Sequence, residues 1–319
     1  MIFDIKKITS ALIVSIILVT GCNKNSVEKE NISEQEILNI EQENIAKQEI
    51  LNIEQETLDI MVSIAPQKYF VEKIGGDRVN INIMVEGNSE PETYEPKPQQ
   101  LQSLEETEVY ISIGVPFEDK WLEKFADIND QMAIIDSGKG IERLEMIEHD
   151  SDHHHHGEDN LDPHIWLSPS LVKQQAQNIY ENLILLDEDN KDFYQENLEQ
   201  FLTEIEELDQ EIKNTLKDIK NRKFVVFHPA WGYFANDYNL EQIPIEVGGQ
   251  EPSAAELSQL INTAKNNNIK VVFVQPQFKM KNAETIAQEI NGEIIIIDPL
   301  ALNWSENLLN ISQTFNSNL

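Results

Sequence analysis

The histidines of this 319-residue chain stand in three places, and imidazole is a common ligand of transition metals. Five of the seven lie in the acidic tract 148–159, and they are His149, His153, His154, His155 and His156. No folded core packs such a sequence, so we expect a surface loop that chelates zinc, copper or nickel with low specificity. A solvated, pH-sensitive loop is the alternative, and the internal position argues against an expression tag.

The other two histidines stand in more apolar sequence. His164 lies in the segment 162–169, and His228 directly follows the apolar run 223–227. That run is a predicted strand, and open α/β sheets place their ligand sites at the carboxyl ends of strands. Asp298 follows a similar apolar run. Each residue alone is weak evidence, since strand-end aspartates commonly cap helices, but two imidazoles and a carboxylate from different crossovers form a reasonable metal shell.

The elements that must position these residues follow an α/β pattern in two sets. Runs typical of strands, separated by helical or turn sequence, occur at 59–65, 79–85, 109–113 and 132–136, and again at 223–227, 271–275 and 293–297. Between the sets, residues 189–221 contain neither Gly nor Pro and repeat apolar residues at helical spacing. A helix of about 30 residues spans about 45–50 Å. We therefore predict two lobes, each a small parallel sheet covered by helices, joined by one long rigid helix.

The N-terminus predicts export and lipid attachment. Lys6 and Lys7 precede an apolar run over 8–19, which is too short to span a membrane and typical of a signal peptide. Small residues then lead to Cys22, the only cysteine, which excludes an intrachain disulfide. We expect cleavage before Cys22, lipidation of its thiol, and anchoring outside the cytoplasmic membrane, at the cell surface or in the periplasm.

These features divide the chain into consecutive segments. A polar spacer follows the signal, and nine of its residues, 35–43, recur at 48–56. The predicted boundaries are 1–21 for the signal peptide, 22–57 for the spacer, 58–187 for the N-terminal lobe, 188–221 for the connecting helix and 222–319 for the C-terminal lobe.

Charge and missing motifs exclude several classes of function. Acidic residues outnumber basic ones by 57 to 24, and the formal charge of −33 repels nucleic acid. The chain has no His-Glu-x-x-His, no Gly-x-Ser-x-Gly and no phosphate-binding Gly-Lys-Ser/Thr loop, so we predict no enzyme. The alternatives to a metal carrier are a secreted zinc hydrolase, a surface adhesin or scaffold, and a metal buffer that meets no transporter.

The segments 162–169, 227–234 and 250–253 resemble the zinc- and manganese-binding proteins of ABC importers, the cluster A-I solute-binding proteins. The resemblance covers residues 59–319 and is closest to the zinc-binding members. It implies two lobes with the metal between them, an ABC permease as partner, and His164, His228 and Asp298 at ligand positions. We expect a monomer, since one tethered receptor per permease suffices.

One ligand position departs from that family. Where the family usually has a His, in the segment 87–96, this chain has Glu92. Two His and two carboxylates make a harder shell, which favours manganese or ferrous iron, whereas the His-rich loop and His228 favour zinc. Calcium and magnesium prefer oxygen ligands throughout. We expect Zn²⁺ as the transported ligand with Mn²⁺ as the alternative, and metal binding that favours the lobe arrangement in which the four ligands converge.

Overall fold

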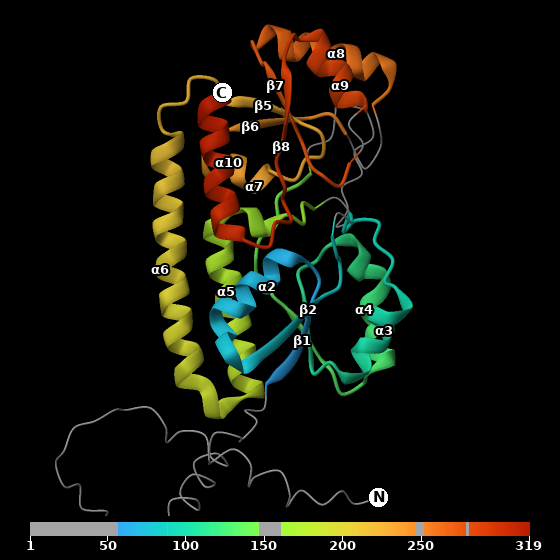
Figure 1. The fold of residues 1–319 in the computed structure, drawn as a ribbon, viewed down its shortest axis with the longest axis vertical. Helices are drawn as coiled ribbons and strands as arrows, with labels where there is room; N and C mark the ends of the chain where they lie inside the picture. The colour runs from blue at the N-terminus through green and yellow to red at the C-terminus, as the bar shows by residue number, and fades with distance from the viewer. Residues whose placement is uncertain (1–56, 88, 147–160, 247–251, 279–280) are drawn as a thin grey trace, which may run out of the picture. The chain divides into compact units, whose positions relative to one another are not determined.

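Two four-stranded parallel sheets organise the computed structural model, which describes residues 57–319 apart from 88, 147–160, 247–251 and 279–280 (Figure 1). The first sheet has the order β2-β1-β3-β4, with β1 at Leu58–Val62, β2 at Val79–Ile83, β3 at Val109–Ser112 and β4 at Ala133–Asp136. The second has the matching order β6-β5-β7-β8, with β5 at Lys223–Val226, β6 at Glu241–Pro244, β7 at Val271–Val274 and β8 at Glu293–Ile296.

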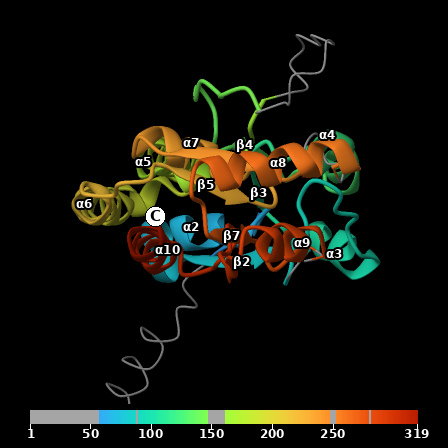
Figure 2. The same cartoon turned by 90° about the horizontal axis from the view of Figure 1, so that it is seen from above.

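Helices cover both faces of the strands. Seen from above, α4, α5, α7 and α8 lie on one side and α2, α3, α9 and α10 on the other (Figure 2). The α-helices are α2 Ala65–Gly75, α3 Pro98–Ser103, α4 Pro116–Ile128, α5 Pro169–Leu186, α6 Lys191–Leu216, α7 Gly232–Asp237, α8 Ala254–Asn266, α9 Lys281–Glu289 and α10 Trp304–Asn318. Single 3₁₀ turns are η2 Gly76–Arg78, η3 Leu104–Glu106, η5 Ile165–Leu167 and η6 Glu188–Asn190.

The central strands are continuous apolar runs because helices bury both of their faces. Every residue of β3 and of β7 is buried. In each sheet the order in which strands are added reverses at the centre, between β1 and β3 in the first sheet and between β5 and β7 in the second. Loops that leave the carboxyl ends of such neighbouring strands diverge and leave a crevice, which is where α/β sheets bind ligands.

The long helix α6 follows directly from its sequence pattern. Its buried residues recur every three or four positions, and they are Tyr194, Leu198, Phe201, Ile205, Leu208, Ile212 and Leu216. This stripe packs against α5 and α2 of the first half and against α10 of the second (Figure 1). The predicted fold of two parallel sheets and one long helix is confirmed, although α6, with 26 residues, is shorter than the predicted segment 188–221.

A shared aromatic core joins the two halves. Trp304, at the start of α10, meets Phe70 of α2 edge to face, with ring centroids 5.1 Å apart. Phe70 in turn packs on Phe201 of α6, with centroids 6.0 Å apart. One continuous apolar cluster therefore includes helices that flank both sheets.

The strand β6 is not revealed by the hydrophobic pattern. It lies at the edge of its sheet, begins with the polar Glu241 and Gln242, and ends at Pro244. Edge strands tolerate proline because one side of their backbone needs no ladder partner. Short and polar, this segment lacks the apolar run by which the other strands were predicted.

Several predictions concern residues outside the described part of the chain. The signal over 1–21, the lipidated Cys22, nearly all of the spacer and the His-rich loop fall there. The predicted lobe boundaries stay predictions. Among the described helices, none combines the length and apolar character needed to cross a membrane.

We expect Trp304→Ala to lower the free energy of unfolding by about 3–5 kcal/mol, because it leaves a cavity in the core shared by both halves. Trp304 is 1% exposed, whereas Leu185, at the end of α5, is 80% exposed. Leu185→Ala is the control and should change stability by no more than about 0.5 kcal/mol. Urea denaturation of both variants measures the difference, and equal midpoints would contradict this account of the core.

Candidate metal centre

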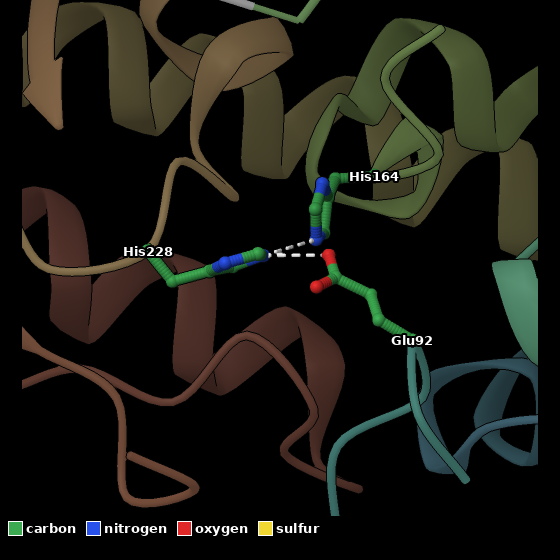
Figure 3. A group of neighbouring side chains, drawn as sticks. All are labelled: Glu92, His164 and His228. Atoms are coloured by element: carbon green, nitrogen blue, oxygen red, sulfur yellow. Dashed lines mark hydrogen bonds and ion pairs between the residues drawn. The ribbon is translucent and has the colours of Figure 1, made fainter. Parts of the chain in front are cut away.

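Three of the four predicted metal ligands meet between the two sheets. The ligand atoms of Glu92, His164 and His228 all lie within 4.8 Å of one another (Figure 3). The Nε2 atoms of the two histidines are 3.4 Å apart, and Nε2 of His228 is 2.9 Å from Oε1 of Glu92. Both histidines are 5% exposed. The group is therefore a convergent set of two buried nitrogen donors and one partly buried oxygen donor.

Glu92 belongs to the segment that connects β2 to α3. Two contacts beside it fix this segment: the carbonyl of Pro91 accepts a hydrogen bond from the backbone N–H of Phe117 at 3.3 Å, and the hydroxyl of Tyr94 donates to Gln100 at 2.7 Å. The first contact ties the segment to α4 and the second ties it to α3. Glu92 thus projects from a loop that is held on both sides of it, at Pro91 and at Tyr94.

His164 is oriented by Asp162, two residues earlier. One carboxylate oxygen, Oδ1, accepts from the backbone N–H of His164 at 2.9 Å and pairs with its Nδ1 at 2.7 Å. Asp162 is itself held, because its carbonyl accepts from the hydroxyl of Tyr233 at 2.8 Å. A carboxylate at Nδ1 keeps the proton on that atom, so the lone pair of Nε2 faces the site.

Three residues of the second half of the chain hold the backbone, the Nδ1 atom and the ring face of His228. Its backbone N–H donates to Gln275 at 3.2 Å and its carbonyl accepts from the same side chain at 2.6 Å. Its Nδ1 lies 3.1 Å from Oε2 of Glu246, and the ring of Phe278 stacks on it at 4.9 Å. The ring can therefore offer only Nε2 to an ion.

The carboxylates around His228 control its protonation. Burial lowers the pKa of His228, but Glu246 and Glu92 raise it more, to about 10. Burial raises the pKa of Glu92, whereas its pairing with His228 lowers that pKa, to about 2. Glu90 lines the same pocket as Glu92, His164 and His228, and burial together with the charge of Glu92 raises the pKa of Glu90 to about 7. A metal must therefore displace the proton of His228, and its affinity should rise with pH.

The geometry fits a small tetrahedral cation. Zinc binds imidazole nitrogen at about 2.0–2.1 Å, and a tetrahedral angle then places two such nitrogens about 3.3–3.4 Å apart. His164 and His228 already stand at this separation. Two imidazoles and a carboxylate suit zinc and other transition metals better than calcium or magnesium, which prefer oxygen donors.

Asp298, the fourth predicted ligand, lies beside this group rather than in it. It follows β8, and its Oδ1 accepts hydrogen bonds from Nε2 of Gln277 at 3.0 Å and from the backbone N–H of Leu300 at 2.9 Å. Gln277 and Leu300 both line the pocket that contains Glu92. The carboxylate of Asp298 is thus held behind two residues of the pocket wall and is not itself in the group of converging ligands.

Two carboxylates that orient the histidines were not predicted as site residues. Asp162 stands in the His164 segment, and the Asp-Pro-His order was a signal that could have revealed it, because it places a carboxylate beside the imidazole. Glu246 follows β6, the strand that the hydrophobic pattern missed. Without that strand, nothing in the sequence placed Glu246 at the edge of the site.

The comparisons with known proteins agree with this geometry. Residues 60–316 match the family model described as "Zinc-uptake complex component A periplasmic". The chain belongs to this family. The resemblance to the zinc-binding cluster A-I proteins is therefore confirmed.

Individual members of the family show how far the similarity extends. The chain is 28% identical over 251 residues to the high-affinity zinc uptake system protein ZnuA of Bacillus subtilis (strain 168). This match covers 76% of this chain and 78% of the relative. The zinc-binding lipoprotein AdcA of Streptococcus pneumoniae (strain ATCC BAA-255 / R6) is 26% identical, and the match covers 76% of this chain and 50% of that longer relative. A solved crystal structure of ZnuA is 53% identical, with a TM-score of 0.77, and covers 82% of this chain and 99% of that one.

In the metal-free protein, Glu92→Gln should lower the pKa of His228 from about 10 toward the ordinary value of about 6.5, because it removes one of two neighbouring carboxylates. NMR titration of the imidazole measures this shift, with the exposed Glu95→Gln as control. Since the folded pKa is the higher one, His228 stabilises the fold below about pH 6.5, and this contribution is lost as the pH rises through about 10. An unchanged pKa in Glu92→Gln would contradict the described pairing.

Asp162→Asn should weaken zinc binding by about 10- to 100-fold, the usual effect of removing a carboxylate that orients a ligating histidine. The amide keeps the size of the side chain but no longer carries the charge that holds the proton on Nδ1. Competition with a chelating dye measures the affinity. Asp127→Asn, at an exposed position on α4, is the matched control and should bind zinc as the unmodified protein does.

Proposed function

We propose that this chain is the extracytoplasmic zinc receptor of an ABC importer, a solute-binding protein that captures Zn²⁺ and delivers it to the permease. The observation that carries the proposal is the 3.4 Å separation of two buried imidazole Nε2 atoms, each backed by a carboxylate at Nδ1. The printed descriptions of the family and of the relatives, which name zinc uptake, support zinc as the cargo.

The proposed ligands are Glu92, His164, His228 and Asp298. The first three converge in the described structure, and the carboxylate of Asp298 is hydrogen-bonded to Gln277 and Leu300, two residues that line the same pocket. Four protein ligands leave no open position for a reacting water, which catalytic zinc sites keep. The function proposed is therefore capture and delivery rather than catalysis, and a secreted zinc hydrolase is disfavoured.

The remaining parts of the proposal concern location and partners. Lipidation at Cys22 would tether the mature chain outside the cytoplasmic membrane, through the spacer 22–57, and the lipoprotein relative supports an anchor of this kind. The His-rich loop would act as an auxiliary site that gathers metal near the receptor. An ABC permease is the partner, and the receptor works as a monomer.

Manganese or ferrous iron is the second candidate cargo, and a specific observation favours it. Glu92 adds a carboxylate to the group, and a second one from Asp298 would make the donor set half oxygen, which harder cations prefer. The descriptions of the family and of the relatives, which name zinc uptake, favour zinc. An adhesin role has no such support from the site, because a buried ligand group contributes nothing to a docking surface.

Competitive titration of the metal-free protein with zinc and manganese tests the proposal. We expect zinc to bind at nanomolar concentration or more tightly and to exclude manganese, and His164→Ala and Glu92→Ala to weaken zinc by several orders of magnitude. Glu95→Ala, an exposed carboxylate three residues from Glu92, is the matched control and should leave affinity unchanged. Tight manganese binding, with zinc bound weakly, would change the cargo, and unchanged zinc affinity in both ligand variants would overturn the site.

A further inference from the structure

The segment 275–278 stands between the two proposed ligands of the second half. It begins where β7 ends, and β7 lies between β5, which leads to His228, and β8, which leads to Asp298. Because the carboxyl ends of parallel strands meet at one edge of a sheet, this loop is placed beside both residues. The segment supplies no ligand of its own in the group of Glu92, His164 and His228.

The ends of this segment fix His228. Gln275 brackets its backbone with two hydrogen bonds, at 3.2 Å to the N–H and 2.6 Å to the carbonyl. Phe278 stacks on the imidazole with an interplanar angle of 16° and a centroid separation of 4.9 Å. The loop therefore sets both the position and the plane of one ligand.

Gln277, between them, fixes Asp298. Its Nε2 donates to Oδ1 of Asp298 at 3.0 Å, and the backbone N–H of Leu300 donates to the same oxygen at 2.9 Å. Oδ2 has no hydrogen-bond partner among the described residues. The amide oxygen of Gln277 is buried and also lacks a partner within the described part of the chain, so the bond to Asp298 is what holds this side chain. One oxygen of Asp298 is thus engaged twice while the other remains available.

We propose that Gln277 is a specificity-determining residue of the site, which reserves Oδ1 of Asp298 and leaves Oδ2 alone to bind the metal. The inference rests on the proposed function, in which Asp298 is the fourth ligand. An oxygen that already accepts two hydrogen bonds is a poor ligand for a metal. Asp298 therefore contributes one ligand atom, Oδ2. With Glu92, His164 and His228 the ion then has four, the number that zinc prefers.

Loss of the Gln277 bond would leave Oδ1 with one hydrogen bond, from the backbone N–H of Leu300, and with one acceptor direction free for the ion. A carboxylate with both oxygens available can bind in bidentate fashion and raise the coordination number to five or more. Manganese favours higher coordination and oxygen donors, whereas zinc gains little from them. Gln277 touches no ion itself, so it acts by positioning Asp298, and its effect should appear in the choice between metals.

The test compares Gln277→Met, which keeps the volume but cannot donate, with the unmodified protein. We expect the ratio of zinc to manganese affinity, measured by competition with a chelating dye, to fall by about tenfold or more, the usual scale for a residue that orients a ligand. In the Co²⁺-loaded protein, the intense visible absorption typical of four-coordinate cobalt should weaken. Gln277→Ser, which is too short to reach Asp298, should behave in the same way, and thermal unfolding of the metal-free variants verifies that both fold.

Asp298→Asn separates the two proposals. If it leaves zinc affinity unchanged, Asp298 is not a ligand, and the proposed ligand set fails together with this inference. If Asp298→Asn weakens zinc while Gln277→Met and Gln277→Ser retain the metal ratio and the cobalt spectrum, the receptor function stands and the role of Gln277 is wrong. Gln277→Met added to Asp298→Asn should have no further effect on the ratio, and a further fall would also overturn the proposed route through Asp298.

Discussion

The centre depends on the pairing of each buried imidazole with a carboxylate on the side away from the ion. Asp162 holds Nδ1 of His164 at 2.7 Å, and Glu246 holds Nδ1 of His228 at 3.1 Å. Burying an imidazole is costly unless its polar atoms are satisfied. These two pairs satisfy one nitrogen of each ring and thereby direct the other nitrogen of each ring into the pocket. The 3.4 Å approach of the two Nε2 atoms follows from this constraint.

The second sheet supplies one of these pairs from the carboxyl ends of its strands. His228 follows β5, Glu246 follows β6, and Gln275 follows β7, so three neighbouring strands end around one imidazole. The segment of His164 reaches the same place from the first half, and Trp166 in it donates to the carbonyl of Pro299 at 2.7 Å. The indole of Trp304 donates to the carbonyl of Trp166 at 2.6 Å, so the aromatic core and the site share one set of contacts.

The features that depend on a short stretch of sequence, such as strands and helices, could be predicted from the sequence. Apolar runs located seven of the described strands, the spacing of apolar residues located α6, and His228 was correctly placed after β5. The edge strand β6 escaped because its burial comes from packing rather than from its own pattern, and Glu246 escaped with it. Asp298 was placed after β8, but its orientation depends on Gln277, which is 21 residues earlier in the chain. The position of Glu92 came from family resemblance, since no local pattern marks it as a ligand.

The contacts also bear on how such a site takes up an ion. The sequence suggested that lobe movement brings the ligands together, yet His164 is bonded to the second half through Asp162 and Tyr233 and through Trp166 and Pro299. Separating His164 from His228 would break these hydrogen bonds, each worth about 0.5–1.5 kcal/mol net. The fold itself therefore stabilises the arrangement in which the two imidazoles meet. The pKa of His228 is about 10 without metal, so its imidazole carries a proton whose positive charge faces Glu92 and Glu246. An incoming cation must displace this proton, and metal uptake is therefore coupled to proton release.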